Sequence, residues 1–153
     1  MSLRLNSPMP ELAGATDWLV GTQPKLEELT GHPTLIYFWS ATCHTCHDNM
    51  PHLIRWRKQY DPMGFKMVAI HAPRSEAETD SSVVLPKIEE YEISEPCCLD
   101  NQHKLMGAFE NEFFPAYFLF DRNGTLLRRA AGNAGVARLE PVLDQLFNNP
   151  SNN

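Results

Sequence analysis

The stretch Thr34-Leu-Ile-Tyr-Phe-Trp39 is an unbroken run of apolar and aromatic residues, and Cys43-His-Thr-Cys46 follows it closely. A continuous run of this kind is typical of a strand that is buried on both faces of a sheet. Apolar residues at helical spacing then predict a helix over residues 46–60, in which Pro51 lies early enough to cause only a kink. The cysteine pair is therefore expected where a buried strand passes into a helix.

Strands and helices alternate along the rest of the chain. The patterns predict strands over residues 65–71 and 95–99, helices over 83–91, 101–110 and 137–147, and a hairpin of 114–120 and 125–130 closed by Asp121-Arg-Asn-Gly124. The helix at 83–91 is expected to start near Ser82, so that Pro86 falls in its first turn. This order predicts an α/β fold with a mixed central sheet flanked by helices.

The length of 153 residues fits one domain with its own core. Residues 1–30, rich in Pro and Gly, are interpreted as an N-terminal extension that packs on the domain through Trp18 and Leu19. Residues 31–147 form the predicted domain, and residues 148–153 a polar tail.

Composition narrows the classes of partner. The net charge of −6 argues against nucleic acid, which requires a clustered basic face. The longest apolar stretches are too short to span a membrane, and a monomer is expected. Met1-Ser-Leu-Arg4 lacks the apolar segment of a signal peptide. A periplasmic or extracytoplasmic location is expected if a signal segment precedes it, and a cytoplasmic location otherwise.

The spacing of Cys43 and Cys46 suits thiol chemistry. A thiolate at the start of a helix meets unpaired N–H groups and the positive end of the helix dipole, both of which lower a thiol pKa. One sulfur can attack a disulfide and the second can resolve the mixed disulfide. We expect Cys43 to attack, Cys46 to resolve, and His44 with Thr45 to tune the pair.

The same residues permit a metal- or haem-binding module as an alternative function. A CxxC pair occurs in zinc sites, but the adjacent Cys97 and Cys98 lack the spacing of a second pair. With His47 the motif reads CxxCH, the attachment signature of c-type haem. The six histidines, together with the thiolates, also suit copper. The strand before Cys43 favours thiol–disulfide exchange without a metal or cofactor.

Several motifs in register carry a family resemblance. They are Phe38-Trp39-Ser-Ala-Thr-Cys43-His-Thr-Cys46, Met50-Pro51-His-Leu53, Phe65-Lys-Met-Val-Ala-Ile-His-Ala-Pro73, Ile93-Ser-Glu-Pro96, Leu99-Asp100-Asn101 and Phe114-Pro115-Ala-Tyr-Phe-Leu-Phe-Asp121-Arg-Asn-Gly124. In order and spacing this resembles the thioredoxin-like TlpA and ResA group of thiol–disulfide oxidoreductases, and within it the DipZ-type domains most.

The resemblance implies a thioredoxin-like fold and disulfide exchange with protein partners. It also implies that Pro115 is a cis-proline facing the cysteines, with a backbone that can pair with an extended substrate segment. Trp39, Thr42, Phe114 and Pro115 are then expected to form the substrate groove.

This chain departs from the family pattern at three positions. Thr42 replaces the tryptophan that usually precedes the first cysteine, Tyr37 replaces a buried aspartate, and Asn49 replaces a glutamate near the active site. Both usual carboxylate proton acceptors are therefore expected to be absent. The dipeptide His44-Thr45 lacks the proline of strongly reducing thioredoxins, which predicts a more oxidising couple.

Cys97 and Cys98 are adjacent in a predicted strand, where their side chains face opposite ways. We expect them to be buried packing residues. A redox relay with Cys43 or Cys46 is the alternative.

Overall fold

The computed structural model describes residues 3–148, which fold around one six-stranded sheet. The strands are β1 (Asp17–Val20), β2 (Thr34–Trp39), β3 (Lys66–His71), β4 (Cys97–Leu99), β5 (Ala116–Phe120) and β6 (Leu126–Ala131). The helices are α1 (Leu26–Leu29), α2 (His44–Tyr60), α3 (Ser81–Glu90), α4 (Lys104–Ala108) and α5 (Gly135–Asn148), with short 3-10 helices η1 (Asp61–Met63) and η2 (Glu76–Thr79). Strand order across the sheet is β1-β4-β3-β2-β5-β6.

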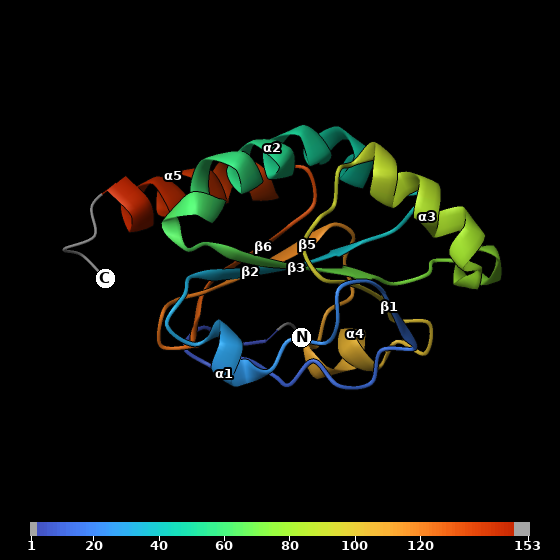
Figure 1. Cartoon of the computed structure of the whole chain (residues 1–153), viewed down its shortest axis with the longest axis horizontal. Coiled ribbons are helices and arrows are strands. Elements are labelled where there is room, and N and C mark those ends of the chain that lie inside the picture. Colours follow the sequence, from blue (N-terminus) through green and yellow to red (C-terminus); the bar gives the residue numbers. More distant parts are fainter. Residues whose placement is uncertain (1–2, 149–153) are drawn as a thin grey trace.

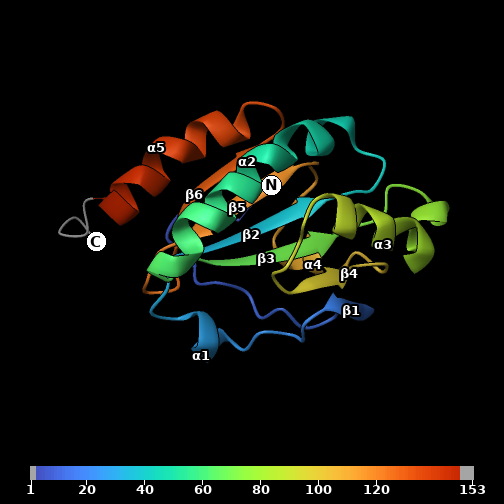
Figure 2. The same cartoon turned by 45° about the horizontal axis from the view of Figure 1, so that its top comes forward.

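The sheet is mixed and covered on both faces. β2, β3 and β4 run parallel, whereas β5, β6 and β1 pair antiparallel with their neighbours. Helices α2, α3 and α5 lie on one face and α1 and α4 on the other (Figure 1). The turned view shows α2 lying along the central strands (Figure 2). This arrangement confirms the predicted thioredoxin-like α/β fold.

Strand β2 is the centre of two cores because its side chains alternate between the faces. Leu35, Tyr37 and Trp39 join the apolar cluster under α2 and α5, while Ile36 and Phe38 join the cluster on the opposite face. All five are fully buried. Because both faces of β2 are buried, its sequence is apolar without a break. The end of this apolar run marks where β2 ends and the cysteine segment begins.

Two helices differ from their expected bounds. Helix α3 begins at Ser81 behind the N-cap Asp80, so Pro86 lies in its second turn and not its first. Helix α4 is shorter than the predicted 101–110, because His103 with a φ of 58° cannot belong to a right-handed helix.

The first 30 residues supply β1, which pairs with β4 at the edge of the sheet. The short pattern in this Pro- and Gly-rich segment did not predict a strand. Of the expected polar tail, Asn148 ends α5, and residues 149–153 lie outside the described residues. The division of the chain at residue 30 stays a prediction.

Candidate active site

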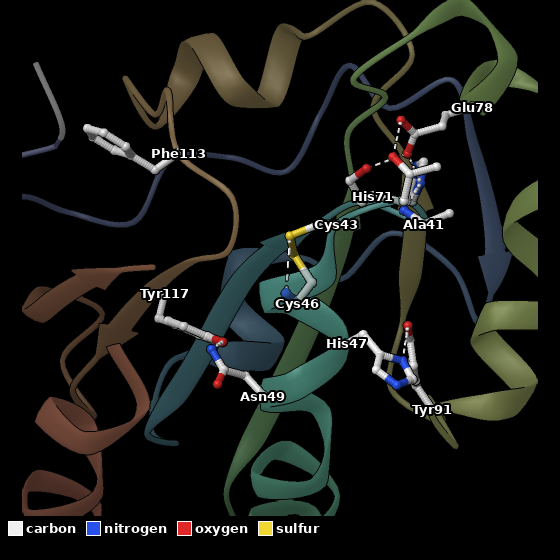
Figure 3. Close-up of a disulfide and its surroundings, with 12 residues drawn as sticks. Ala41, Cys43, Cys46, His47, Asn49, His71, Glu78, Tyr91, Phe113 and Tyr117 are labelled. Atoms are coloured by element: carbon white, nitrogen blue, oxygen red, sulfur yellow. Dashed lines mark hydrogen bonds and ion pairs between the residues drawn. A yellow bond between two sulfur atoms is a disulfide. The ribbon is translucent and has the colours of Figure 1, made fainter. Parts of the chain in front are cut away.

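Cys43 and Cys46 lie where β2 leads into α2, joined by a disulfide (Figure 3). Cys43 is the N-cap of α2, and its sulfur accepts a hydrogen bond from the backbone N–H of Cys46 at 3.1 Å. Cys43 is 5% exposed and Cys46 is 1% exposed. An N-capping thiolate is stabilised by the free N–H groups and the dipole of the 17-residue helix. Cys43 is therefore the better placed of the two to attack a partner.

A buried glutamate, which the sequence did not predict as a site residue, holds the segment before Cys43. The Glu78 carboxylate accepts hydrogen bonds from the Ser40 hydroxyl, from the Thr42 hydroxyl at 3.0 Å and from the Arg74 backbone N–H at 3.1 Å. Burial alone would raise the pKa of Glu78, but these hydrogen bonds outweigh it and lower the pKa. Glu78 is thus an ionised carboxylate that is 1% exposed and bound to uncharged donors.

His71, at the end of β3, supports the same segment as a neutral ring. Its Nε2 accepts a hydrogen bond from the backbone N–H of Ala41 at 3.1 Å, which places the ring proton on Nδ1. Burial lowers the pKa of His71 to about 4, although the charge of Glu78 acts in the opposite direction. The distance of 3.6 Å between Nε2 and the Glu78 carboxylate is therefore a contact with a neutral ring and not an ion pair.

The loop before β5 carries the expected groove residues Phe114 and Pro115. The peptide bond between Phe114 and Pro115 is cis. Phe114 is half-buried, and the guanidinium of Arg74 lies 6.0 Å from the centre of its ring. Arg74 therefore contacts Glu78 through its backbone and Phe114 through its side chain.

Helix α3 completes the site on the other side. An open hollow of about 280 Å³ lies against Cys43 and is lined by Ala41, Thr42, Cys43, His44, His47, Lys87 and Tyr91. The His47 ring and the Tyr91 hydroxyl share a hydrogen bond of 2.9 Å between α2 and α3. His47 is exposed but is partly fixed by this bond. Lys87 and Tyr91 are lining residues that no sequence pattern near the cysteines could indicate.

The predicted tuning and groove residues lie at different depths. His44 and Thr42 are exposed beside the disulfide, Thr45 is half-buried and Pro115 is buried. Trp39 does not line a groove: its side chain is fully buried and packs edge-on against His71 at 4.9 Å between ring centres. The reason is the alternation of β2, which directs Trp39 under the helices.

Asn49 is buried in α2 and donates a hydrogen bond to the Tyr117 hydroxyl at 3.3 Å. It therefore links α2 to β5 and offers no carboxylate. The two positions at which the family carries its carboxylates hold Tyr37 and Asn49, and a different carboxylate, that of Glu78, is brought by η2 to the segment before Cys43.

A separate buried cluster lies beside β4. Glu95 accepts hydrogen bonds from the Tyr37 hydroxyl at 2.7 Å and from Arg57 Nη2 at 2.8 Å. Cys97 and Cys98 are free and fully buried, on opposite faces of the sheet. Burial, with a smaller contribution from the charge of Glu95, raises the pKa of Cys97 to about 12. Burial also raises the pKa of Cys98. Both thiols stay protonated, which favours the packing interpretation.

Within residues 3–148, no group of three or more His, Cys, Asp or Glu side chains is arranged to hold a metal ion. None of the helices in that range has the length and apolar character needed to cross a bilayer.

Comparison with known proteins agrees with this geometry. Residues 6–129 match the model of the AhpC/TSA family. The chain is 40% identical over 145 residues to the thiol–disulfide oxidoreductase YkuV of Bacillus subtilis, covering 95% of this chain and 97% of that protein. It is 31% identical to the protein DipZ of Mycobacterium tuberculosis over 91% of this chain, which spans only 20% of DipZ.

Among solved structures, the solution structure of a thioredoxin-like protein in the oxidized form superposes with a TM-score of 0.86 at 39% identity. The match covers 95% of this chain and 98% of that one. The resemblance to thioredoxin-like thiol–disulfide oxidoreductases inferred from the sequence motifs is confirmed, although the identity to YkuV is higher than that to DipZ, which the motifs favoured.

Proposed function

The chain belongs to the AhpC/TSA family of thioredoxin-like proteins and is a thiol–disulfide oxidoreductase, and from that premise we propose that it exchanges disulfides with protein partners through Cys43 and Cys46. The observation that carries the proposal is the position of Cys43, which caps α2 and is disulfide-linked to Cys46. A pair that closes a disulfide at a helix N-terminus can hold either redox state and can exchange it with another disulfide.

The reducing direction proceeds in two displacements. The Cys43 thiolate attacks one sulfur of the partner disulfide, which breaks the partner S–S bond and releases the other partner sulfur as a thiolate that takes up a proton. Cys46, after losing its proton, attacks the Cys43 sulfur of the mixed disulfide. The second partner thiol leaves, and the Cys43–Cys46 disulfide forms. Two electrons pass to the partner, and the oxidising direction is the reverse.

The partner segment is expected to lie between Thr42, His44 and the loop of Phe114 and Pro115. Thr42 and His44 are exposed beside the disulfide, and the backbone next to Pro115 can pair with an extended chain. His44, when protonated, would stabilise the Cys43 thiolate. The protein acts as a monomer in this proposal.

The test is a trapping experiment with a disulfide-containing protein such as insulin. The reduced wild-type protein is expected to turn over the substrate, and Cys46→Ser to accumulate a mixed disulfide through Cys43. Cys43→Ser is expected to lose turnover by on the order of a thousandfold, because the attacking sulfur is gone. A wild-type protein without turnover in either direction would exclude the function, and a metal ion or haem retained by both cysteines would favour the binding module.

The redox potential gives a second test. Because His44-Thr45 lacks proline, the Cys43–Cys46 couple is expected above the value of about −270 mV typical of thioredoxin. Titration of the reduced and oxidised forms in glutathione buffers measures it. A value at or below that of thioredoxin would contradict the expectation.

A further inference from the structure

We propose that Glu78 is the positioning residue of this active site, holding both walls beside Cys43 in register for disulfide exchange. The inference rests on the proposed exchange function and adds a residue that lies 35 positions beyond Cys43 in the sequence. Glu78 touches neither sulfur in the described contacts, so it acts through the residues that it binds.

The first wall is the segment between β2 and α2. Glu78 accepts from the hydroxyls of Ser40 and Thr42. Ala41 lies between these two residues, and its backbone N–H donates a hydrogen bond to His71, which packs beside Glu78. Each residue that leads from β2 to Cys43 therefore donates a hydrogen bond to β3 or η2. Figure 3 shows His71 and Glu78 beside Ala41. Fixed in this way, the segment sets where the Cys43 sulfur stands at the start of α2.

The second wall is the Phe114 ring next to Pro115. The Arg74 backbone N–H donates to Glu78, and the Arg74 guanidinium lies over the Phe114 ring. One carboxylate thus connects the segment before Cys43 with the loop across from it. A substrate disulfide has to fit between these two walls, and small displacements in such a fit reduce rates strongly.

The energetic cost of burying Glu78 as an anion favours a functional role for this residue. A carboxylate with almost no exposure and no cationic partner is costly unless all its donors are in place. Two titratable groups lie near it: the ring of His71, which is neutral, and the guanidinium of Arg74, which lies over the Phe114 ring. An uncharged side chain could hold the loop equally well. A fixed negative charge behind residues 40–42 has a further effect, because it destabilises a thiolate at Cys43. Glu78 therefore sets both geometry and redox poise.

The experiment compares Glu78→Gln with Glu76→Gln in the full chain. Glu76 is an exposed glutamate in the same short helix η2, so it is a matched control for charge and local structure. Insulin reduction, the Cys43–Cys46 potential and the fraction folded are measured for each. Glu78→Gln is expected to lower kcat/KM per folded molecule by on the order of tenfold and to shift the potential upward, since the reduced thiolate loses a nearby negative charge. Glu76→Gln is expected to match the wild type.

Thr42→Val provides a variant that leaves the buried carboxylate in place if Glu78→Gln does not fold. It removes one donor at an exposed position, and a several-fold loss of kcat/KM is expected with an unchanged free energy of unfolding to within about 1 kcal/mol. Wild-type kcat/KM and potential in both Glu78→Gln and Thr42→Val would overturn the role of Glu78. An inactive wild-type protein would instead overturn the exchange function itself.

Discussion

Two regions of this molecule contain similar residues and differ in what those residues can do. Near the end of β2, Cys43 and Cys46 lie with the buried carboxylate of Glu78. Beside β4, Cys97 and Cys98 lie with the buried carboxylate of Glu95. The first pair stands at a helix start and is joined, whereas the second pair projects to opposite faces of a strand and is free.

The buried carboxylates of the two regions also differ, in whether a cation neutralises them. Glu95 is neutralised by Arg57 at 2.8 Å, so it forms a buried ion pair within the core. Glu78 is bound by hydroxyls and a backbone N–H, with its charge uncompensated. Residue type alone therefore does not separate a redox site from a packed core. Two features distinguish the redox site from the packed core: its cysteines lie at the start of a helix, and its buried carboxylate has no counterion.

The largest expected effect on stability belongs to the β4 region. Glu95→Gln leaves the charge of Arg57, whose side chain is 13% exposed, without its partner. The expected loss in the free energy of unfolding is about 3 kcal/mol, at the low end for breaking a buried pair. Denaturant unfolding measures it, and kcat/KM per folded molecule is expected to stay unchanged.

The control is Glu92→Gln, which removes the exposed partner of Lys58, another cation of α2. Exposed pairs contribute little, so a loss below about 1 kcal/mol is expected. Equal losses in the two variants would show that the Glu95 pair is not a structural anchor. A change in the Cys43–Cys46 potential with Glu95→Gln would break the distinction between the regions.

The pH dependence of stability is expected to report the Cys43 region through His71. Its pKa is lowered from 6.5 to about 4 in the folded protein, so the unfolded chain binds more protons between these values. The stability associated with neutral His71 is complete above pH 6.5 and is lost as the pH falls towards 4. The loss is on the order of 3 kcal/mol. Glu78, whose pKa is also lowered, adds a loss only below its unfolded value of 4.5.

Unfolding curves between pH 7 and pH 4 measure this slope. His71→Gln is expected to flatten it, whereas His44→Gln, at an exposed histidine, is expected to keep it. If the slope persisted in His71→Gln, the neutral ring could not be its source.

The sequence predicted the fold and the cysteine site because both depend on local patterns. The apolar run of β2 and the helix spacing after Cys46 place the pair at the start of α2 within two residues. Glu78 escaped prediction since its hydroxyl partners lie 38 and 36 positions away, and a glutamate in a polar stretch carries no signal of burial. Trp39 was wrongly expected in the groove. Strand alternation shows which residues share a face, but the position of the helices decides which face they cover.

A smaller effect is expected for Tyr37, which donates to Glu95. Tyr37→Phe removes a hydrogen bond to a charged group and is expected to cost about 1.5 kcal/mol of stability. Tyr117→Phe removes the longer bond of 3.3 Å to the amide of Asn49 and is expected to cost less. Thermal or denaturant unfolding of the two variants gives the comparison, and the reverse order would show that Glu95 gains little from the tyrosine.

The smallest effect on turnover is expected for substitutions of Cys97 and Cys98. These substitutions test most directly whether the two cysteine pairs differ in function. Cys97 lies in the same apolar core as Cys43 and Cys46, and it is therefore the better candidate of the two for a relay. Burial, however, raises the pKa of Cys97 to about 12, which leaves almost no thiolate to attack the active-site disulfide near neutral pH. Cys98 lies on the far face with its pKa raised by burial as well. The paired variant Cys97→Ala and Cys98→Ala is therefore expected to keep kcat/KM within about twofold of wild type when corrected for the folded fraction, because only packing is removed. A large loss of turnover with Cys97→Ala, but not with Cys98→Ala, would instead show that sulfur under α2 takes part in the exchange.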